Sequence, residues 1–315
     1  MHALVTGVAG FIGSHLADAL LARGDRVIGV DCFTPYYDPA DKRANLAGAL
    51  TRPEFDLVEF DLADESLADL LDGVDVVFHQ AAQPGVRLSW ADGFATYVRN
   101  NVLATQRILE AAAAVGISRV VFASSSSVYG QQPRYPTRED DLPAPYSPYG
   151  VTKLAAEHLC AAYGANLGLS TVALRYFTVF GPRQRPDMSL HRLCDAAISG
   201  ATFPQFGDGL QVREFTYVDD IVAGNLRAAD ADVAPGTVAN LAGGGEITLR
   251  DLIALVEEIS GSPVSVEVQS AQLGDARRNG GTIDRARELL AWEPAVTLRH
   301  GIERQLAWHR ARVTR

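Results

Sequence analysis

Short apolar runs alternate with helical patterns through residues 3–174 of the chain. The runs cover residues 3–6, 27–30, 56–60, 74–79, 120–123 and 171–174, and helices are predicted over 11–22, 97–115 and 147–167. Apolar strands that alternate with helices are typical of a parallel sheet buried on both faces. We therefore expect an α/β fold of the Rossmann type, with a doubly wound parallel sheet.

The pattern loosens after Gly181-Pro182, where stretches containing glycine and proline separate short helices. This half predicts a smaller lobe that binds substrate. We expect a dinucleotide-binding domain over residues 1–180 and a lobe that lies mainly in residues 181–315, with residues 221–228 returning to the first domain.

Charge and cysteine content narrow the possible partners. The 315 residues are 47% hydrophobic and carry a formal net charge of -10, which argues against nucleic-acid or anionic membrane surfaces. Cys32, Cys160 and Cys194 lack the Cys-x-x-Cys spacing, so we expect neither a disulfide framework nor a metal site. No signal-peptide pattern or long uncharged apolar stretch is present, so a cytoplasmic location is expected.

A glycine-rich turn follows the first apolar run. Gly7, Gly10 and Gly13 would let the backbone approach a pyrophosphate at a helix N-terminus, with Phe11 and Ile12 inside the turn. A plain tight turn between strand and helix is the alternative.

Two acidic residues follow the second and third runs. Asp31 can accept both ribose hydroxyls of NAD and would repel a 2′-phosphate. No Arg or Lys occurs in residues 32–37, which favours NAD over NADP. Asp61 and Leu62 are placed to meet adenine, although Asp61 is equally compatible with a solvated loop.

The sequence Tyr-Gly-Val-Thr-Lys spans residues 149–153. On a helix, Tyr149 and Lys153 lie on one face, one turn apart, so the ammonium could lower the phenol's pKa and make it a general base. Serines 124–127 end the run 120–123, at the edge where open α/β sheets bind ligands, although serines are also ordinary in loops.

Together these motifs resemble the extended short-chain dehydrogenase/reductase family, in particular its sugar-nucleotide epimerases and dehydratases. The resemblance covers nearly the whole chain. It implies that Tyr149 is the catalytic base, that Lys153 also bonds the nicotinamide ribose, and that Ser125 bonds the reacting hydroxyl, with Ser126 as a substitute. It also implies that the cofactor is contacted by Ala81, Ala82, Gln83, Asn100, Ser124 and Tyr176. His79 is expected to be packed at a strand end, without a catalytic role.

The residues after the catalytic hydroxyl favour epimerisation. Dehydratases of the family carry Asp-Glu there, and decarboxylases carry a glutamate before Val-Tyr-Gly, whereas this chain has Ser126 and Ser127. The reaction that remains is epimerisation at C4. In it the C4 hydrogen leaves as hydride, the 4-keto sugar rotates, and the hydride returns to the other face of the sugar.

The substrate half resembles uronate 4-epimerases. Thr178 stands where galactose-type enzymes have asparagine, and Arg185, with Arg87, could hold a C6 carboxylate. The alternative is that these arginines serve the diphosphate or surface ion pairs. The resemblance implies that Arg213 and Arg278 contact the diphosphate, although Arg277 is adjacent to Arg278 and could take its place. It also implies that Gln205 and Phe206 contact the uridine and that Ser126 contacts the substrate.

The expected reaction is thus the NAD-dependent conversion of UDP-glucuronate to UDP-galacturonate. UDP-glucose 4-epimerase is the chief alternative, followed by a UDP-sugar decarboxylase or dehydratase. A dinucleotide sensor without catalysis is disfavoured by the intact Tyr149 and Lys153. A homodimer is expected through the helices near 97–115 and 147–167.

Overall fold

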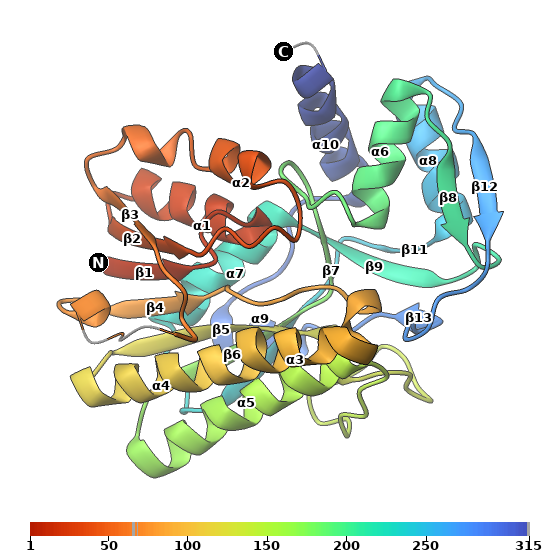
Figure 1. Ribbon diagram of the computed structural model, residues 1–315. Helices are drawn as coiled ribbons and strands as arrows, with labels where there is room; N and C mark the ends of the chain where they lie inside the picture. The colour runs from red at the N-terminus through yellow and green to blue at the C-terminus, as the bar shows by residue number, and fades with distance from the viewer. Residues whose placement is uncertain (65–66, 68, 314–315) are drawn as a thin grey trace.

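The computed structural model describes residues 1–64, 67 and 69–313 (Figure 1). Within that part of the chain, seven strands form one parallel sheet in the order β10-β6-β5-β4-β1-β2-β3. The strands are β1 (His2–Thr6), β2 (Arg26–Asp31), β3 (Phe55–Glu59), β4 (Val76–His79), β5 (Arg119–Ser125), β6 (Thr171–Tyr176) and β10 (Thr237–Leu241). The predicted Rossmann-type fold is confirmed. The strand order reverses between β1 and β4, which opens a crevice at their carboxyl ends.

Helices cover both faces of this sheet (Figure 1). One face carries α1 (Phe11–Ala22), α2 (Pro39–Asn45) and α7 (Val218–Asp230), and the other carries α3 (Phe94–Tyr97), α4 (Ala104–Val115) and α5 (Pro148–Leu167). A π-helical turn, Val98–Leu103, joins α3 to α4, so the helix predicted over 97–115 is present but wider in its first third. The side chain of Ser147 caps α5 by accepting from the Gly150 N–H.

The remaining elements form a second layer beside the crevice. Strand β9 (Val212–Tyr217) pairs with β7 (Thr178–Phe180), β11 (Glu246–Thr248) and β13 (Arg278–Asn279), while β8 (Phe203–Phe206) pairs with β12 (Val266–Gln269). The helices here are α6 (Ser189–Ser199), α8 (Leu249–Ser260) and α10 (Leu298–Val313), whereas α9 (Asp284–Leu290) packs on β10 and α7 at the large sheet. One-turn helices lie at Ala49–Thr51, Asp69–Leu71, Arg87–Ser89, Ala91–Gly93 and Ser126–Val128. Among the described helices, none is both long and apolar enough to cross a membrane.

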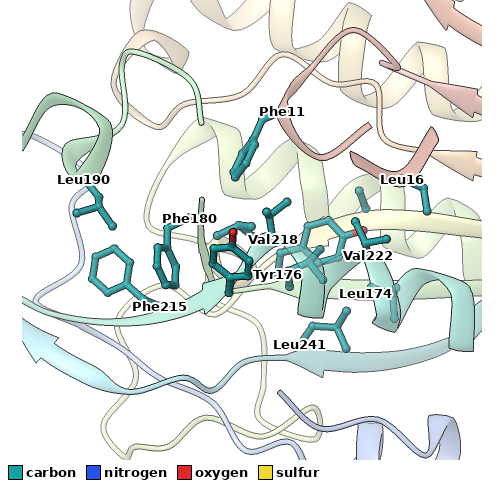
Figure 2. Close-up of a cluster of buried hydrophobic side chains, with 14 of the residues drawn as sticks. Phe11, Leu16, Leu174, Tyr176, Phe180, Leu190, Phe215, Val218, Val222 and Leu241 are labelled. Atoms are coloured by element: carbon teal, nitrogen blue, oxygen red, sulfur yellow. The ribbon is translucent and has the colours of Figure 1, made fainter. Parts of the chain in front are cut away.

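A single apolar cluster joins the two layers. Figure 2 shows Phe180, Phe215 and Leu190 together at one end of this cluster and Leu174 with Val222 at the other, and all five side chains are buried. Helix α7 packs on α1, and β10 extends the sheet beside β6, although both follow residue 181 in sequence. A division of the chain near residue 181 remains a prediction about folding units.

Candidate active site

Two cavities meet at the crevice. The first, of about 210 Å³, is lined by every residue predicted to bind the cofactor: Gly7, Gly10, Phe11, Ile12, Gly13, Asp31, Asp61, Leu62, Ala81, Ala82, Gln83, Asn100, Ser124, Tyr149, Lys153 and Tyr176. The second, of about 360 Å³, is lined by all four serines of the run and by Arg213 and Arg278. Tyr149 and Arg185 line both cavities, so they lie where a cofactor in the first cavity and a substrate in the second would meet.

The glycine turn leaves no room for side chains. A Cβ on Gly13 would come within 2.2 Å of the Gly7 carbonyl oxygen, and one on Gly7 would lie 2.8 Å from the Ala81 Cα. Gly7 also has a φ of +66°, a conformation that favours glycine. The backbone therefore closes tightly here and can approach a pyrophosphate at the N-terminus of α1.

Asp31 is fixed at the end of β2. Its two oxygens accept from the Ala9 and Phe33 N–H groups, at 3.1 and 2.8 Å. Lys42 Nζ lies 3.7 Å from the same carboxylate and is also buried. Lys42 lies outside residues 32–37, on which the NAD prediction relied, so it was not predicted; it reaches the cavity from α2.

Another wall of the first cavity is held in place by Asn101, a buried residue that was not predicted. Asn101 Oδ1 accepts from the Gln83 N–H at 2.7 Å, and its Nδ2 donates to the Gln83 carbonyl and to Thr152 Oγ1. Asn101 lies in the π-helical turn, whose extra residue per turn lets the neighbouring Asn100 line the cavity as well. Asp61, on the adenine side, pairs with Arg99 at 3.0 Å.

Tyr149 lies in a buried setting that affects its phenol. Burial raises the pKa of this phenol, and the groups that oppose the rise are a hydrogen bond with Ser125 and the charge of Arg185. The Lys153 ammonium donates to the Ala123 carbonyl at the end of β5, at 2.8 Å. That Lys153 lowers the pKa of Tyr149 and bonds the nicotinamide ribose stays a prediction. Burial lowers the pKa of Lys153 itself to about 8.

A buried ion pair between Arg175 and Glu157 contacts the first serine of the run. Arg175 donates from Nε and Nη2 to the two oxygens of Glu157, at 2.9 and 2.7 Å, and Ser124 Oγ donates to the same carboxylate. Glu157 lies one turn beyond Lys153 on α5 and opposes the burial effect on its pKa. Tyr149, Lys153 and Glu157 thus form one stripe along the helix.

Arg185 is already paired on the protein side. Its Nε and Nη2 donate to the two carboxylate oxygens of Asp187 at 3.0 and 3.1 Å, and Tyr36 donates to Asp187 at 3.2 Å. Burial opposes the charge of Arg185, but Asp187 raises its pKa above the ordinary value, so the guanidinium stays charged. Thr178 lines the same cavity at the start of β7.

The other predicted substrate residues are divided between the second cavity, a third cavity and neither, and Arg213 lines both cavities. Ser126, Arg213 and Arg278 line the second cavity, where Ser126 Oγ accepts from Asn279, and Arg278 pairs with Glu246 at 2.6 Å. A third cavity, of about 160 Å³, is lined by Arg87 and Phe206, whose guanidinium and ring centroid are 4.1 Å apart. Gln205 is buried, donates to the Gly207 carbonyl and lines none of these three cavities.

His79 is packed beneath the sheet edge. Its ring nitrogens contact Thr6 Oγ1 at 2.8 Å and Thr105 Oγ1 at 3.0 Å, and burial lowers its pKa to about 3. It is therefore a neutral buried residue, as the sequence analysis expects.

Comparison with known proteins agrees with this geometry. The profile of the NAD dependent epimerase/dehydratase family matches residues 3–242. The "Uncharacterized UDP-glucose epimerase YtcB" of Bacillus subtilis is 41% identical over 312 residues, covering 98% of both chains. The UDP-glucuronate 4-epimerase of Thermodesulfobacterium geofontis is 35% identical, covering 98% of this chain and 96% of that protein.

A solved structure is similar over the whole fold. The UDP-glucuronic acid 4-epimerase of Bacillus cereus, in complex with UDP-glucuronic acid and NAD, superposes with a TM-score of 0.96 at 40% identity, covering 99% of each chain. The resemblance proposed from the sequence motifs is confirmed.

Proposed function

Because the chain belongs to the NAD dependent epimerase/dehydratase family, we propose that it converts UDP-glucuronate to UDP-galacturonate by inverting C4. The observation that carries this proposal is a charged arginine, Arg185, that lines both cavities beside Tyr149. The 40% identical B. cereus enzyme, crystallised with UDP-glucuronic acid and NAD, supports the same substrate. The expectation of an NAD-dependent epimerase, an isomerase, is confirmed.

The first cavity fits NAD. The closed glycine turn admits a pyrophosphate, and Asp31 is oriented by two backbone N–H groups so that it can accept from ribose hydroxyls. When bound, NAD supplies a hydride acceptor that returns the hydride within one turnover. Such an enzyme gains nothing by releasing its cofactor, so the purified protein should carry NAD. Chromatography of the supernatant after denaturation checks this, and recovery of NADP instead would contradict the assignment of NAD as the cofactor.

The residues that move the proton are Tyr149 and Ser125. We assign proton removal from the C4 hydroxyl to the Tyr149 phenolate, which Ser125 and the charge of Arg185 stabilise against burial. Lys153 holds the end of β5 through the Ala123 carbonyl and presents a positive charge to the cofactor cavity. Ser125 is held in turn, because its Oγ accepts from the Ser127 N–H at 3.1 Å.

Arg185 would hold the C6 carboxylate of the uronate, with Thr178 beside it. A 4-keto uronate is a β-keto acid that readily loses CO2, and stabilising its carboxylate in the ground state raises that barrier. Arg185→Ala removes a charge-assisted contact worth roughly 1.5 to 3 kcal/mol, which is about 10- to 150-fold in kcat/KM. We expect that loss with UDP-glucuronate, a much smaller loss with UDP-glucose, and release of some UDP-pentose.

UDP-glucose is the second candidate substrate, favoured by the description of the B. subtilis relative as a UDP-glucose epimerase. Purified protein should be incubated separately with each sugar nucleotide and the products identified by NMR. Turnover of UDP-glucose alone would reject the uronate proposal. Equal losses on both sugars in Arg185→Ala would place Arg185 on the diphosphate, and Arg185→Lys shows whether charge without the forked geometry is enough.

The helices α4 and α5 are proposed to pair with a second copy of the chain. They lie side by side on one face of the sheet (Figure 1), and Leu103, Val115, Val151 and Leu167 expose their side chains along them and the adjoining turn. A Leu103→Glu variant should shift the molecular mass measured by light scattering from dimer to monomer. The matched control is Leu142→Glu, in an exposed loop; a monomeric wild type would reject the proposal.

The cytoplasmic location also stays a proposal. Its support is that Cys32, Cys160 and Cys194 are all free thiols, as expected in a reducing compartment.

A further inference from the structure

Two histidines and an aspartate meet between α6 and α10, outside the cavities of the candidate active site. His191 and Asp195 are one turn apart on α6, and His309 comes from α10. Both rings are buried, whereas 53% of the Asp195 side chain is exposed. One nitrogen of each ring and the Asp195 carboxylate all lie within 4.8 Å of one another.

The hydrogen bonds of His191 fix which of its nitrogens carries a proton. Its Nδ1 lies 2.6 Å from the Gln184 carbonyl oxygen, which can only accept, so Nδ1 is protonated. In the neutral ring Nε2 is then a lone pair, yet it lies 3.1 Å from Asp195 Oδ2. A lone pair that faces a carboxylate needs a cation between them, which is either a second proton on the ring or a metal ion.

His309 shares the same carboxylate. Its Nδ1 lies 2.6 Å from Asp195 Oδ1, and its buried Nε2 has no hydrogen-bond partner. The ring centroids of His191 and His309 are only 4.5 Å apart. A nitrogen of each ring faces the same Asp195 carboxylate, and two imidazoles with one carboxylate are a donor set that suits a divalent transition metal.

We propose that His191 Nε2, His309 Nδ1 and one oxygen of Asp195 bind a Zn²⁺ ion. Zinc takes imidazole and carboxylate ligands at roughly 2.0 to 2.2 Å, which puts tetrahedral ligand atoms about 3.3 Å apart. The nitrogens of His191 and His309 lie 3.1 and 2.6 Å from the Asp195 oxygens, and the three ligand atoms lie within 4.8 Å of one another, so the side chains must adjust around the ion to reach that spacing. The Gln184 carbonyl already supplies the outer-shell acceptor that a metal-bound histidine usually has.

With three protein ligands, the fourth position is left to water on the open side of Asp195. The ion would tie α6 to α10 beside the segment that carries Arg185, because Gln184 bonds His191 through its carbonyl and Gln305 of α10 through its side chain. The sequence analysis expected no metal because it considered cysteine spacing alone, and His309 lies 114 residues from Asp195.

The test compares two exposed aspartates that both contact α10. Asp195→Asn removes a proposed ligand, and Asp219→Asn removes the carboxylate that pairs with Arg304 at 2.9 Å. Untagged protein is stripped with a chelator and titrated with Zn²⁺ against a chromogenic competitor. We expect one Zn²⁺ per chain in wild type and in Asp219→Asn. Binding by Asp195→Asn should be weaker by at least about 10- to 100-fold, the range found even for loss of an outer-shell partner.

Thermal unfolding provides a second readout. Saturating Zn²⁺ should raise the Tm of wild type and of Asp219→Asn but leave that of Asp195→Asn and of His309→Ala unchanged. Stoichiometric Co²⁺ should give visible absorption bands in wild type that both cluster variants lack. If wild type binds no more Zn²⁺ than Asp195→Asn, the cluster is a hydrogen-bonded ion pair and the proposal fails. Equal loss in Asp219→Asn would also overturn it, since the effect would then not depend on the three ligands.

Discussion

Arg185 and Asp187, two residues apart on one loop, form a two-pronged ion pair between the second cavity, which Arg185 lines, and the third, which Asp187 lines. The arginine assigned to a substrate carboxylate therefore already carries a carboxylate of the protein. A uronate must share the remaining face of the guanidinium, so Asp187 both orients Arg185 and competes electrostatically with the ligand.

Asp187→Asn should strengthen binding of the uronate selectively. The variant keeps an acceptor for Arg185 but removes a negative charge that repels the C6 carboxylate. Because the pair is partly solvent-exposed, the gain should be modest, about 0.2 to 1 kcal/mol, or roughly 1.5- to 5-fold in KM for UDP-glucuronate. Steady-state kinetics on both sugars checks this. An unchanged KM for UDP-glucuronate, or an equal gain for UDP-glucose, would contradict the shared-guanidinium arrangement.

Tyr149→Phe should abolish turnover while the sugar nucleotide still binds. The ring keeps its edge-on contact with Tyr97, at 6.1 Å between centroids, and only the proton acceptor is lost. Loss of general-base catalysis typically costs on the order of 100- to 10,000-fold. Near-normal turnover in a folded variant would remove Tyr149 from its assigned role.

Substitutions in the serine run test which serine carries the catalytic hydroxyl. Ser125→Ala should reduce kcat less than Tyr149→Phe does, because it removes one hydrogen bond to the phenol. Ser126→Ala should affect it less again, since Ser126 Oγ contacts Asn279. If Ser126→Ala proves the worse variant, the catalytic hydroxyl lies one residue later in the run.

Lys153→Met should inactivate the enzyme and stabilise its fold. The pKa of Lys153 falls from 10.5 to about 8, so the unfolded chain binds more protons between those values. The cost of burying the charge is fully present below pH 8 and disappears as the pH rises to 10.5. At about 1.36 kcal/mol per unit, and less the lost bond to Ala123, we expect a gain of roughly 1 to 2 kcal/mol at neutral pH. Urea unfolding across this window measures it; a gain that does not shrink above pH 8 would reject the assignment.

Glu157→Gln should strongly destabilise the protein. It leaves the Arg175 charge buried without its partner and removes the acceptor for Ser124. Breaking a buried pair in this way typically costs about 3 to 5 kcal/mol. The matched control is Glu59→Gln, whose partner Arg43 is exposed and where no measurable change is expected. Similar unfolding midpoints for the two variants would show that the buried pair contributes little.

The parts of this site that follow local sequence rules could be predicted. The glycine turn, Asp31 and the Tyr149–Lys153 spacing are set by one strand and one helix each, and the cavity contains all of them. Local spacing also predicted that Lys153 acts on Tyr149, but it does not specify the direction of a long side chain. The ammonium donates to a backbone carbonyl, and the charge that opposes the burial-raised pKa of Tyr149 comes from Arg185 on a distant loop.

The residues that the sequence argument missed are brought in by tertiary structure. Asn101 faces Gln83 only because the helix widens to a π turn, and no composition rule marks that turn. β10 lies after residue 181, where the alternation of strands and helices is no longer clear in the sequence. It nevertheless pairs with β6, whose outer edge would otherwise have no partner. Such features depend on contacts between segments far apart in the chain, which periodicity cannot show.

The ammonium of Lys42, 3.7 Å from the Asp31 carboxylate, has a consequence for how this pocket could change its cofactor. Asp31 supplies a negative charge at the end of β2 that would repel a 2′-phosphate, and the buried cation beside it would attract one once that charge was gone. A neutral residue at position 31 would therefore turn an internal ion pair into an unmatched positive site at the ribose. On this geometry, a single substitution at position 31 would separate an NAD-selective protein from an NADP-tolerant one.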